Sequence, residues 1–201
     1  MTKLYAAALA IGLAACTHTS PPSSPQQAAD LEGKAHATLQ SMIAAQPGLS
    51  DLLNASAGYA VFPRVGEASV LIAGGAYGNG VLFQNGQVVG YVDLKQASFG
   101  PQIGAKGYSE LILLRSPYDV ERLKAGKFAL GGDVSAVVLT AGANASGTLD
   151  PNTTVVIESQ GGLQAGISVQ GQRIDFVPRP GGPVGVAQPV GNAACAPAIQ
   201  C

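Results

Sequence analysis

Apolar and polar positions alternate over the central part of the chain and predict consecutive β-strands. From Gly58 to Gly104 the apolar residues follow a two-residue period and glycines interrupt them, which is typical of strands joined by tight turns. Two dipeptides, Asn79-Gly80 and Asn85-Gly86, predict hairpin turns. Ala68 to Gly78 has small residues on both faces, so we expect one strand that a neighbouring element approaches closely.

A different period precedes the strands and predicts a helix from Asp30 to Gln46. This amphipathic stripe either packs on the core of its own domain or lies on a membrane surface. The polar face carries Lys34 and His36 beside two acidic residues, so it lacks the cationic bias of a lipid-seeking helix and favours packing on the core. The stripe consists of Leu31, Ala35, Leu39, Met42 and Ile43.

Two shorter helices are marked by their ends. We expect Ser50 to cap a helix from Asp51 to Ala57, which Gly58 closes in the left-handed conformation. Another begins at Pro117, with Ser116 as its N-cap and Gly126 as its stop. Further strands are predicted at Tyr59–Phe62, ending before Pro63, and at Tyr108–Arg115, Thr154–Ser159, Leu163–Val169 and Arg173–Val177.

These elements predict an α+β fold. We expect a strongly curved antiparallel β-sheet of six or more strands, open or closed into a barrel-like form, with two or three packed helices. The predicted organisation has four parts: a signal peptide at 1–15, a lipidated cysteine with a flexible tether at 16–29, a folded domain at 30–177, and a Pro/Gly-rich tail at 178–201.

The first residues predict a lipoprotein signal. Lys3 precedes an apolar run that is too short to span a bilayer, and Leu13-Ala14-Ala15-Cys16 resembles the bacterial lipobox. Cys16 would then carry acyl chains such as palmitate, and Thr17, where an Asp would favour inner-membrane retention, indicates the outer membrane facing the periplasm. The alternative is an ordinary secretory signal in which Cys16 is incidental.

Two further cysteines lie near the C-terminus. In an oxidising compartment Cys195 and Cys201 are candidates for a disulfide, and metal or redox chemistry is the alternative. No histidine lies nearby, which disfavours zinc, and the sequence predicts no metal site and no cofactor.

Charge and composition exclude some functions. The chain has 47% hydrophobic and 11% charged residues and a net charge of −1, which disfavours a nucleic-acid-binding protein. Catalysis by a Ser–His or Cys–His pair would have to use His36, because His18 lies in the tether. Asp93, Glu110 and Asp133 could include a glycosidase-like pair, although scattered surface acids are the simpler interpretation.

Four basic residues are candidates for binding anionic lipid. Arg122, Lys124 and Lys127 form the one local basic cluster, near the end of the helix that begins at Pro117, and Arg64 follows Pro63 at a predicted strand end. The alternative for the helix residues is interaction with the helix dipole.

A series of short motifs runs through the folded region: Leu52–Ala55, Gly58–Val65, Gly74–Leu82, Tyr91–Leu94, Ser98–Ala105, Gly126–Gly131 and Gly161–Val169. In this order they resemble the SYLF domain, also called the Ysc84 actin-binding domain. The resemblance implies lipid binding, since eukaryotic relatives bind phosphoinositides, partly through an N-terminal amphipathic helix, and some bind actin. This chain differs from them in its non-cationic first helix and its predicted periplasmic location.

We therefore expect a non-enzymatic envelope lipoprotein that binds membrane lipid through anionic headgroups or acyl chains. The first alternative is a structural lipoprotein that contacts an envelope protein partner. The second is a hydrolase acting on envelope substrates.

Overall fold

The computed structural model describes residues 21–70, 73–99, 104–128, 130, 135–140, 153–159 and 171–181. Several predictions lie outside these residues: the signal peptide with Cys16, the strand at 163–169, Asp133, and the tail with Cys195 and Cys201.

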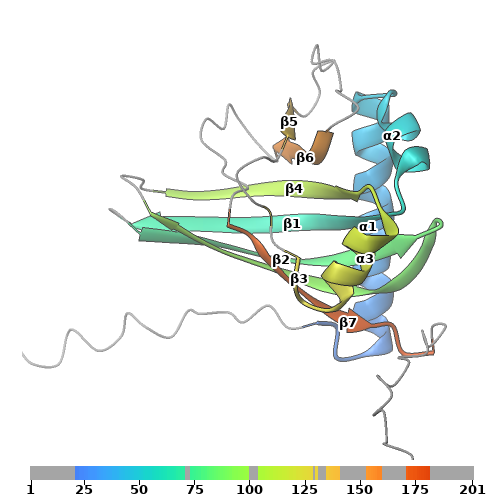
Figure 1. Ribbon diagram of the computed structural model, residues 1–201. Helices are drawn as coiled ribbons and strands as arrows, with labels where there is room; N and C mark the ends of the chain where they lie inside the picture. The colour runs from blue at the N-terminus through green and yellow to red at the C-terminus, as the bar shows by residue number, and fades with distance from the viewer. Residues whose placement is uncertain are drawn as a thin grey trace, which may run out of the picture.

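The described strands form one seven-stranded sheet in the order β5-β6-β4-β1-β2-β3-β7 (Figure 1). The predicted α+β class is confirmed, and every neighbouring pair is antiparallel except β5 and β6, which are parallel. Among the described strands no pairing closes the sheet, so β5 and β7 are its two edges. The strands are β1 Gly58–Val70, β2 Ala73–Gln84, β3 Gln87–Phe99, β4 Gly104–Leu114, β5 Ser135–Thr140, β6 Thr153–Ser159 and β7 Arg173–Pro178.

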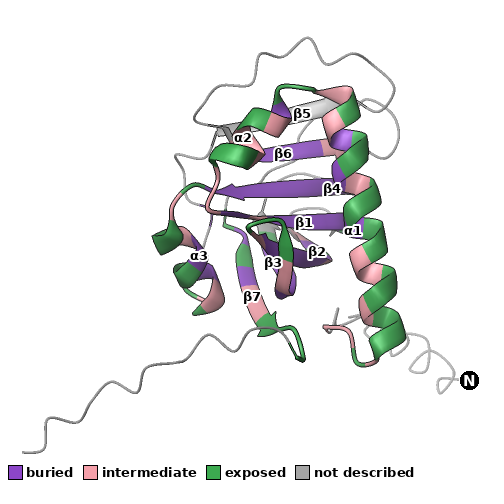
Figure 2. Ribbon diagram, turned by 90° about the vertical axis from the view of Figure 1, so that its right-hand side faces the viewer, coloured by how far each residue is buried: buried purple, intermediate pink, exposed green. Residues whose placement is uncertain are grey.

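Helices cover both faces of the sheet. α1 (Pro25–Ala45) and α3 (Pro117–Lys124) lie on opposite sides of it (Figure 2). α2 (Leu49–Ala55) contributes Leu49 to the same apolar cluster as α1. In that cluster, Ala35, Leu39 and Met42 of α1 are buried against the sheet, which confirms packing of the first helix on its own domain in this structure. Among the described residues, no helix combines the length and apolarity needed to cross a bilayer.

The first hairpin corrects one strand prediction. Ala68 to Gly78 is not one strand, because Ser69 pairs with Gly74 and Ala68 with Gly75 across two antiparallel strands. No turn residue marks the reversal in the sequence, since Leu71 and Ile72 stand between the strands, so the apolar pattern concealed it.

Only one of the two predicted hairpin dipeptides is a turn. Asn85 and Gly86 join β2 to β3 with φ of 52° and 73°, the left-handed values that a tight hairpin requires. Asn79 and Gly80 instead lie inside β2. A Cβ on Gly80 would stand 2.6 Å from the Val61 carbonyl oxygen, so this glycine permits close strand packing.

The first two helices begin earlier than predicted. α1 starts at Pro25, where the composition predicted tether, because the Ser24 hydroxyl accepts a hydrogen bond from the Gln27 amide at 3.2 Å. α2 starts at Leu49 with Gly48 as N-cap, so Ser50 is inside the helix rather than its cap.

Gly58 does not close α2 in the left-handed conformation. It opens β1, where a Cβ would meet the Phe83 carbonyl oxygen at 2.9 Å, so the residue permits a close approach between strands. The α3 prediction is confirmed: Ser116 and Asp119 form a capping box, and Gly126 follows the helix with φ of 65°.

Candidate functional site

An open groove of about 410 Å³ lies between the N-terminal half of α1 and strands β1 and β2. It combines two cations, Lys34 and Arg64, with the exposed aromatic side chain of Tyr77, which is 48% exposed. Its lining residues are Leu31, Lys34, Pro63, Arg64, Gly66, Tyr77, Gly78 and Asn79.

A β-bulge in the central strand directs Arg64 into this groove. Between Val61 and Arg64, β1 advances three residues while β2 advances two, from Val81 to Asn79, and a similar shift occurs against β4. Val61 belongs to the apolar cluster on the α1 side, and the extra residue returns Arg64 to that same side. The prediction that the strand ends before Pro63 is therefore wrong: the strand continues through a bulge that contains the proline.

The bulge is held by a side-chain contact from β4. The Ser109 hydroxyl donates a hydrogen bond of 2.9 Å to the Pro63 carbonyl oxygen, and Ser109 is buried. This contact satisfies a carbonyl at the point where the regular ladder is interrupted. The direction of Arg64 is thus set by a fixed irregularity in β1.

The two cations of the groove differ in their surroundings. Lys34 forms an ion pair of 2.7 Å with Asp30, one turn earlier on α1, with both side chains well exposed to solvent. Arg64 is exposed, and within the part of the chain that the structure describes its guanidinium forms no ion pair. Among the described residues, an anionic ligand would therefore meet the Arg64 guanidinium, which has no ion-pair partner, and the Lys34 ammonium, which also pairs with the solvent-exposed carboxylate of Asp30.

A row of polar residues crosses the sheet beside the groove. Arg64 is opposite Asn79 on β2, which is opposite Asp93 on β3, which is opposite Asp175 on β7. The Asn79 amide donates to Asp93 at 3.1 Å, and Lys95 pairs with Asp175 at 2.8 Å. Burial raises the pKa of Asp93 to about 6, because its loss of solvation and the Asp175 charge outweigh the opposing effect of Lys95.

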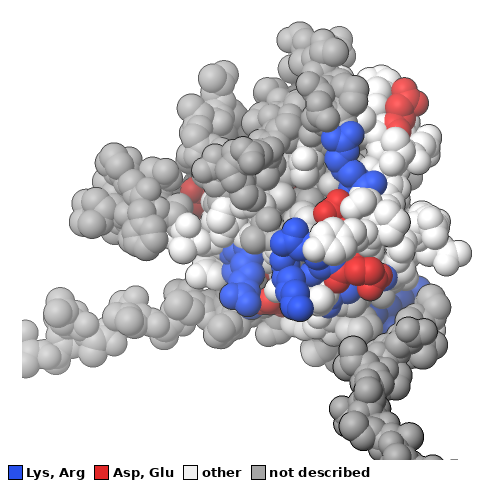
Figure 3. Space-filling view, viewed as in Figure 1, with Lys and Arg blue, Asp and Glu red and all other residues white. Residues whose placement is uncertain are grey.

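The basic cluster belongs to α3, which packs on the face of the sheet opposite to α1. Figure 3, viewed as Figure 1, shows Lys and Arg side chains on the surface of the molecule on this side. Lys124 donates to Gln84 at 3.0 Å and pairs with Glu121 at 3.1 Å. The Arg122 guanidinium donates to the Lys127 carbonyl oxygen at 3.0 Å, where it closes the end of the helix. These are the contacts expected of basic residues at a helix C-terminus.

The structure therefore does not unite the four predicted lipid-binding residues in one patch. Arg122, Lys124 and Lys127 are grouped at the end of α3, as their spacing predicted, and Arg64 faces the opposite side beside α1. Lys34 and Tyr77 were not predicted as part of the site, because their proximity depends on how α1 packs against β1 and β2. Pro63 within an apolar strand was a usable indication of the bulge.

The buried acids also differ from the sequence expectation. Asp93 and Glu110 are 7% and 0% exposed, so they are not scattered surface acids. They also cannot form one glycosidase-like pair, because Asp93 lies on the α1 side of the sheet and Glu110 on the α3 side, as their buried strand neighbours show. His36 places its ring edge-on against Phe83, with the ring centres 5.1 Å apart.

Comparison with known proteins finds a family match within the chain. Residues 95–177 match the family model Ysc84, described as Las17-binding protein actin regulator. Over these residues the chain is similar to the Ysc84 (SYLF) family. No curated protein matches the chain significantly. The matched residues include α3 and its basic cluster, while Lys34 and Arg64 precede them.

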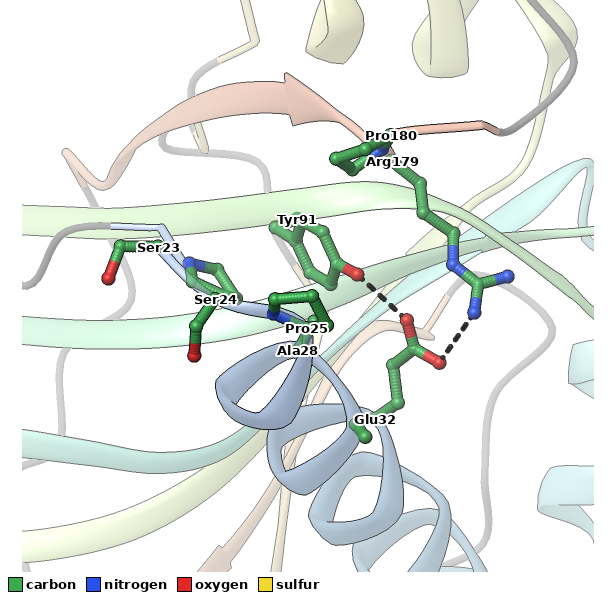
Figure 4. A pocket seen from close by; sticks show the side chains of 10 residues that line it. Ser23, Ser24, Pro25, Ala28, Glu32, Tyr91, Arg179 and Pro180 are labelled. Carbon is green, nitrogen blue, oxygen red and sulfur yellow. Dashed lines mark hydrogen bonds and ion pairs between the residues drawn. The ribbon is translucent and has the colours of Figure 1, made fainter.

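A second pocket, about 310 Å³, lies beside the N-terminus of α1 (Figure 4). Its charged groups are already paired: Glu32 accepts a hydrogen bond of 2.8 Å from the Tyr91 hydroxyl and pairs with Arg179 at 3.0 Å. Burial raises the pKa of Tyr91, and the hydrogen bond to Glu32 raises it further. This triad connects α1 to β3 and to the residue after β7, so we assign it to holding the helix rather than to binding.

Among the described residues, no group of three or more His, Cys, Asp or Glu could hold a metal ion.

Proposed function

We propose that the chain is a non-catalytic, lipid-anchored protein of the bacterial cell envelope whose folded domain binds anionic lipid headgroups in the Lys34–Arg64 groove. The observation that carries the proposal is the bulge that exposes the Arg64 guanidinium beside Lys34 and Tyr77. A guanidinium binds phosphate oxygens in a bidentate geometry, an ammonium adds a second charge, and a tyrosine suits the interface between headgroups and water.

The proposed anchor supports the same surface. If Cys16 carries acyl chains, nine positions separate it from Pro25, the first residue of α1. An extended chain spans at most about 3.5 Å per residue, so the N-terminal end of α1 would stay within roughly 30 Å of the bilayer. Lys34 lies in the N-terminal half of this helix, and the tether would therefore hold the groove close to the headgroups. The same anchor leads us to propose an outer-membrane location facing the periplasm.

The family description supports binding rather than chemistry. It names a regulator of actin that binds Las17, a protein partner, and we propose that the domain has kept a binding role here with lipid as the ligand. The contact of His36 with Phe83 also supports the non-catalytic part of the proposal, since the ring is engaged in packing. Contact with an envelope protein is the competing outcome of the test below.

The test is vesicle co-sedimentation of protein that lacks residues 1–16, so that acyl chains do not mask binding by the domain. We compare the double variant Lys34→Glu and Arg64→Glu with a matched double variant on α3, Arg122→Glu and Lys127→Glu. Each basic residue near an anionic surface contributes about 1 kcal/mol, so the groove variant should bind anionic vesicles at least about 30-fold more weakly.

Three results decide the proposal. A large loss in the groove variant with a small loss in the α3 variant supports the groove. A larger loss in the α3 variant transfers the site to α3 and rejects the groove. Absence of binding by the unsubstituted protein at low salt, to neutral or anionic vesicles, rejects lipid recognition and leaves contact with a protein partner as the explanation.

A further inference from the structure

A polar cluster is buried on the α3 side of the sheet, away from the groove. Tyr108, Glu110 and Gln172 are each 0% exposed, and each has one side-chain oxygen that finds no hydrogen-bond partner among the described residues. Buried polar atoms in native proteins are almost always satisfied, so three orphan oxygens together indicate that something else binds there. Nothing in the proposed function uses these groups.

The orientation of Gln172 is fixed by its neighbours. Its amide nitrogen donates to Glu110 Oε2 at 3.0 Å and lies 3.5 Å from Gln96 Oε1. Reversing the amide would place its oxygen against two other acceptors, so the orphan atom is the Gln172 oxygen. The cluster then offers three oxygens: one from the Glu110 carboxylate, one from an amide, and the Tyr108 hydroxyl.

Among the side chains that the structure describes, no cation pairs with the carboxylates at the cluster, those of Glu110 and the nearly buried Glu67. In the sheet, Glu110 stands between Phe62 on β1 and Ile157 on β6, both apolar. Burial raises the pKa of Glu110 to about 7, and burial together with the charges of Glu110 and Glu67 raises the pKa of Tyr108.

A proton on Glu110 removes the charge but does not satisfy all three oxygens. A small cation would neutralise the carboxylate and would also give the amide and phenol oxygens a partner to ligate. Glu110 is the one carboxylate among the three residues with orphan oxygens, and its single charge favours a monovalent ion over a divalent one. An ammonium ion has three or more N–H donors and no acceptor, which matches three oxygens.

We propose that Tyr108, Glu110 and Gln172 form an internal site for a small monovalent cation of the size of ammonium or potassium. The site is distinct from the Lys34–Arg64 groove, because it lies on the other face of the sheet and requires the opposite charge of ligand. Its failure would therefore leave the lipid proposal untouched.

The test is thermal unfolding of the purified full chain at pH 8 in ammonium, potassium, sodium or tetramethylammonium chloride at equal ionic strength. Tetramethylammonium is too large and has no N–H donor, so it controls for screening. At ten times its dissociation constant, a bound cation should raise Tm by roughly 3 to 6 °C above that control. The rise should shrink at pH 6, where protons compete for Glu110.

Variants locate the effect. Glu110→Gln should abolish the cation-specific rise, and Tyr108→Phe should reduce it. Asp93→Asn removes a buried carboxylate from the other face and should leave it unchanged. A rise with both ammonium and potassium indicates an alkali-type site, and a rise with ammonium alone indicates a hydrogen-bonded amine site. Equal Tm in all four salts, or an equal rise in Glu110→Gln, would overturn the proposal.

Discussion

Replacing Met42 with alanine tests whether α1 is part of the folded core. Met42 is 0% exposed and lies in the apolar cluster between α1 and the sheet, with Phe83 and Leu111. Truncating a fully buried methionine removes its transfer free energy and leaves a cavity, which together cost about 2 to 5 kcal/mol. The free energy of unfolding should fall by that amount, and the lower limit alone should reduce Tm by roughly 4 to 8 °C.

The assay is urea unfolding, without membranes, of protein that lacks residues 1–16. The matched control is Gln40→Ala, two positions away on the exposed side of α1, which should change stability by less than about 0.5 kcal/mol. An unchanged slope against urea would show that the loss is in stability rather than in the surface exposed on unfolding.

One result would refute docking of α1. If Met42→Ala is as stable as Gln40→Ala in solution but binds vesicles more weakly, the stripe contacts lipid instead of the sheet. The groove would then lose its α1 wall, and the headgroup site would have to be sought elsewhere.

Two more predictions follow from single positions. Gly80→Ala should lower the free energy of unfolding by about 1 to 3 kcal/mol, because the new Cβ would meet the Val61 carbonyl oxygen. A Cβ at Gly33 on α1 would meet no atom, so the control Gly33→Ala should not destabilise the protein. Equal urea midpoints for the two variants would contradict this prediction. Folding raises the pKa of Asp93 from 3.8 to about 6, so the stability that protonated Asp93 contributes is present at low pH and declines as the pH rises between these values. Asp93→Asn should remove that decline. An NMR pKa near 4 for Asp93 would contradict the prediction.

The features that sequence predicted correctly are those set by neighbouring residues. The capping box of α3, the Asn85-Gly86 turn and the apolar stripe of α1 each depend on residues within a few positions of one another. Local rules of capping, turn conformation and helical period are sufficient there.

The features that sequence missed depend on strand pairing. Gly80 resembles a turn residue in isolation, and only the position of Phe62 on the adjacent strand shows that it permits close packing. Likewise, Lys34 joins the groove because α1 crosses β1 and β2, which no local pattern specifies.

The burial of Glu110 had a partial indication in the sequence. Tyr108, Glu110 and Ile112 share one face of β4 by their two-residue period, and the same period places Lys106 and Leu114 on that face. A charged residue in that position indicates either an edge or an internal polar site. Only the position of Gln172 distinguishes an edge from an internal polar site. Its amide donates a hydrogen bond to the Glu110 carboxylate from 62 residues away in the chain.

The bulge at Pro63 explains both charged sites together. In a regular strand, alternation from Val61 would place Arg64 on the α3 side, the face that carries Glu110. A guanidinium there would be available to compensate the buried carboxylate. The extra residue instead turns Arg64 to the α1 side, so that among the described residues Arg64 has no ion-pair partner in the groove and Glu110 has none in the core.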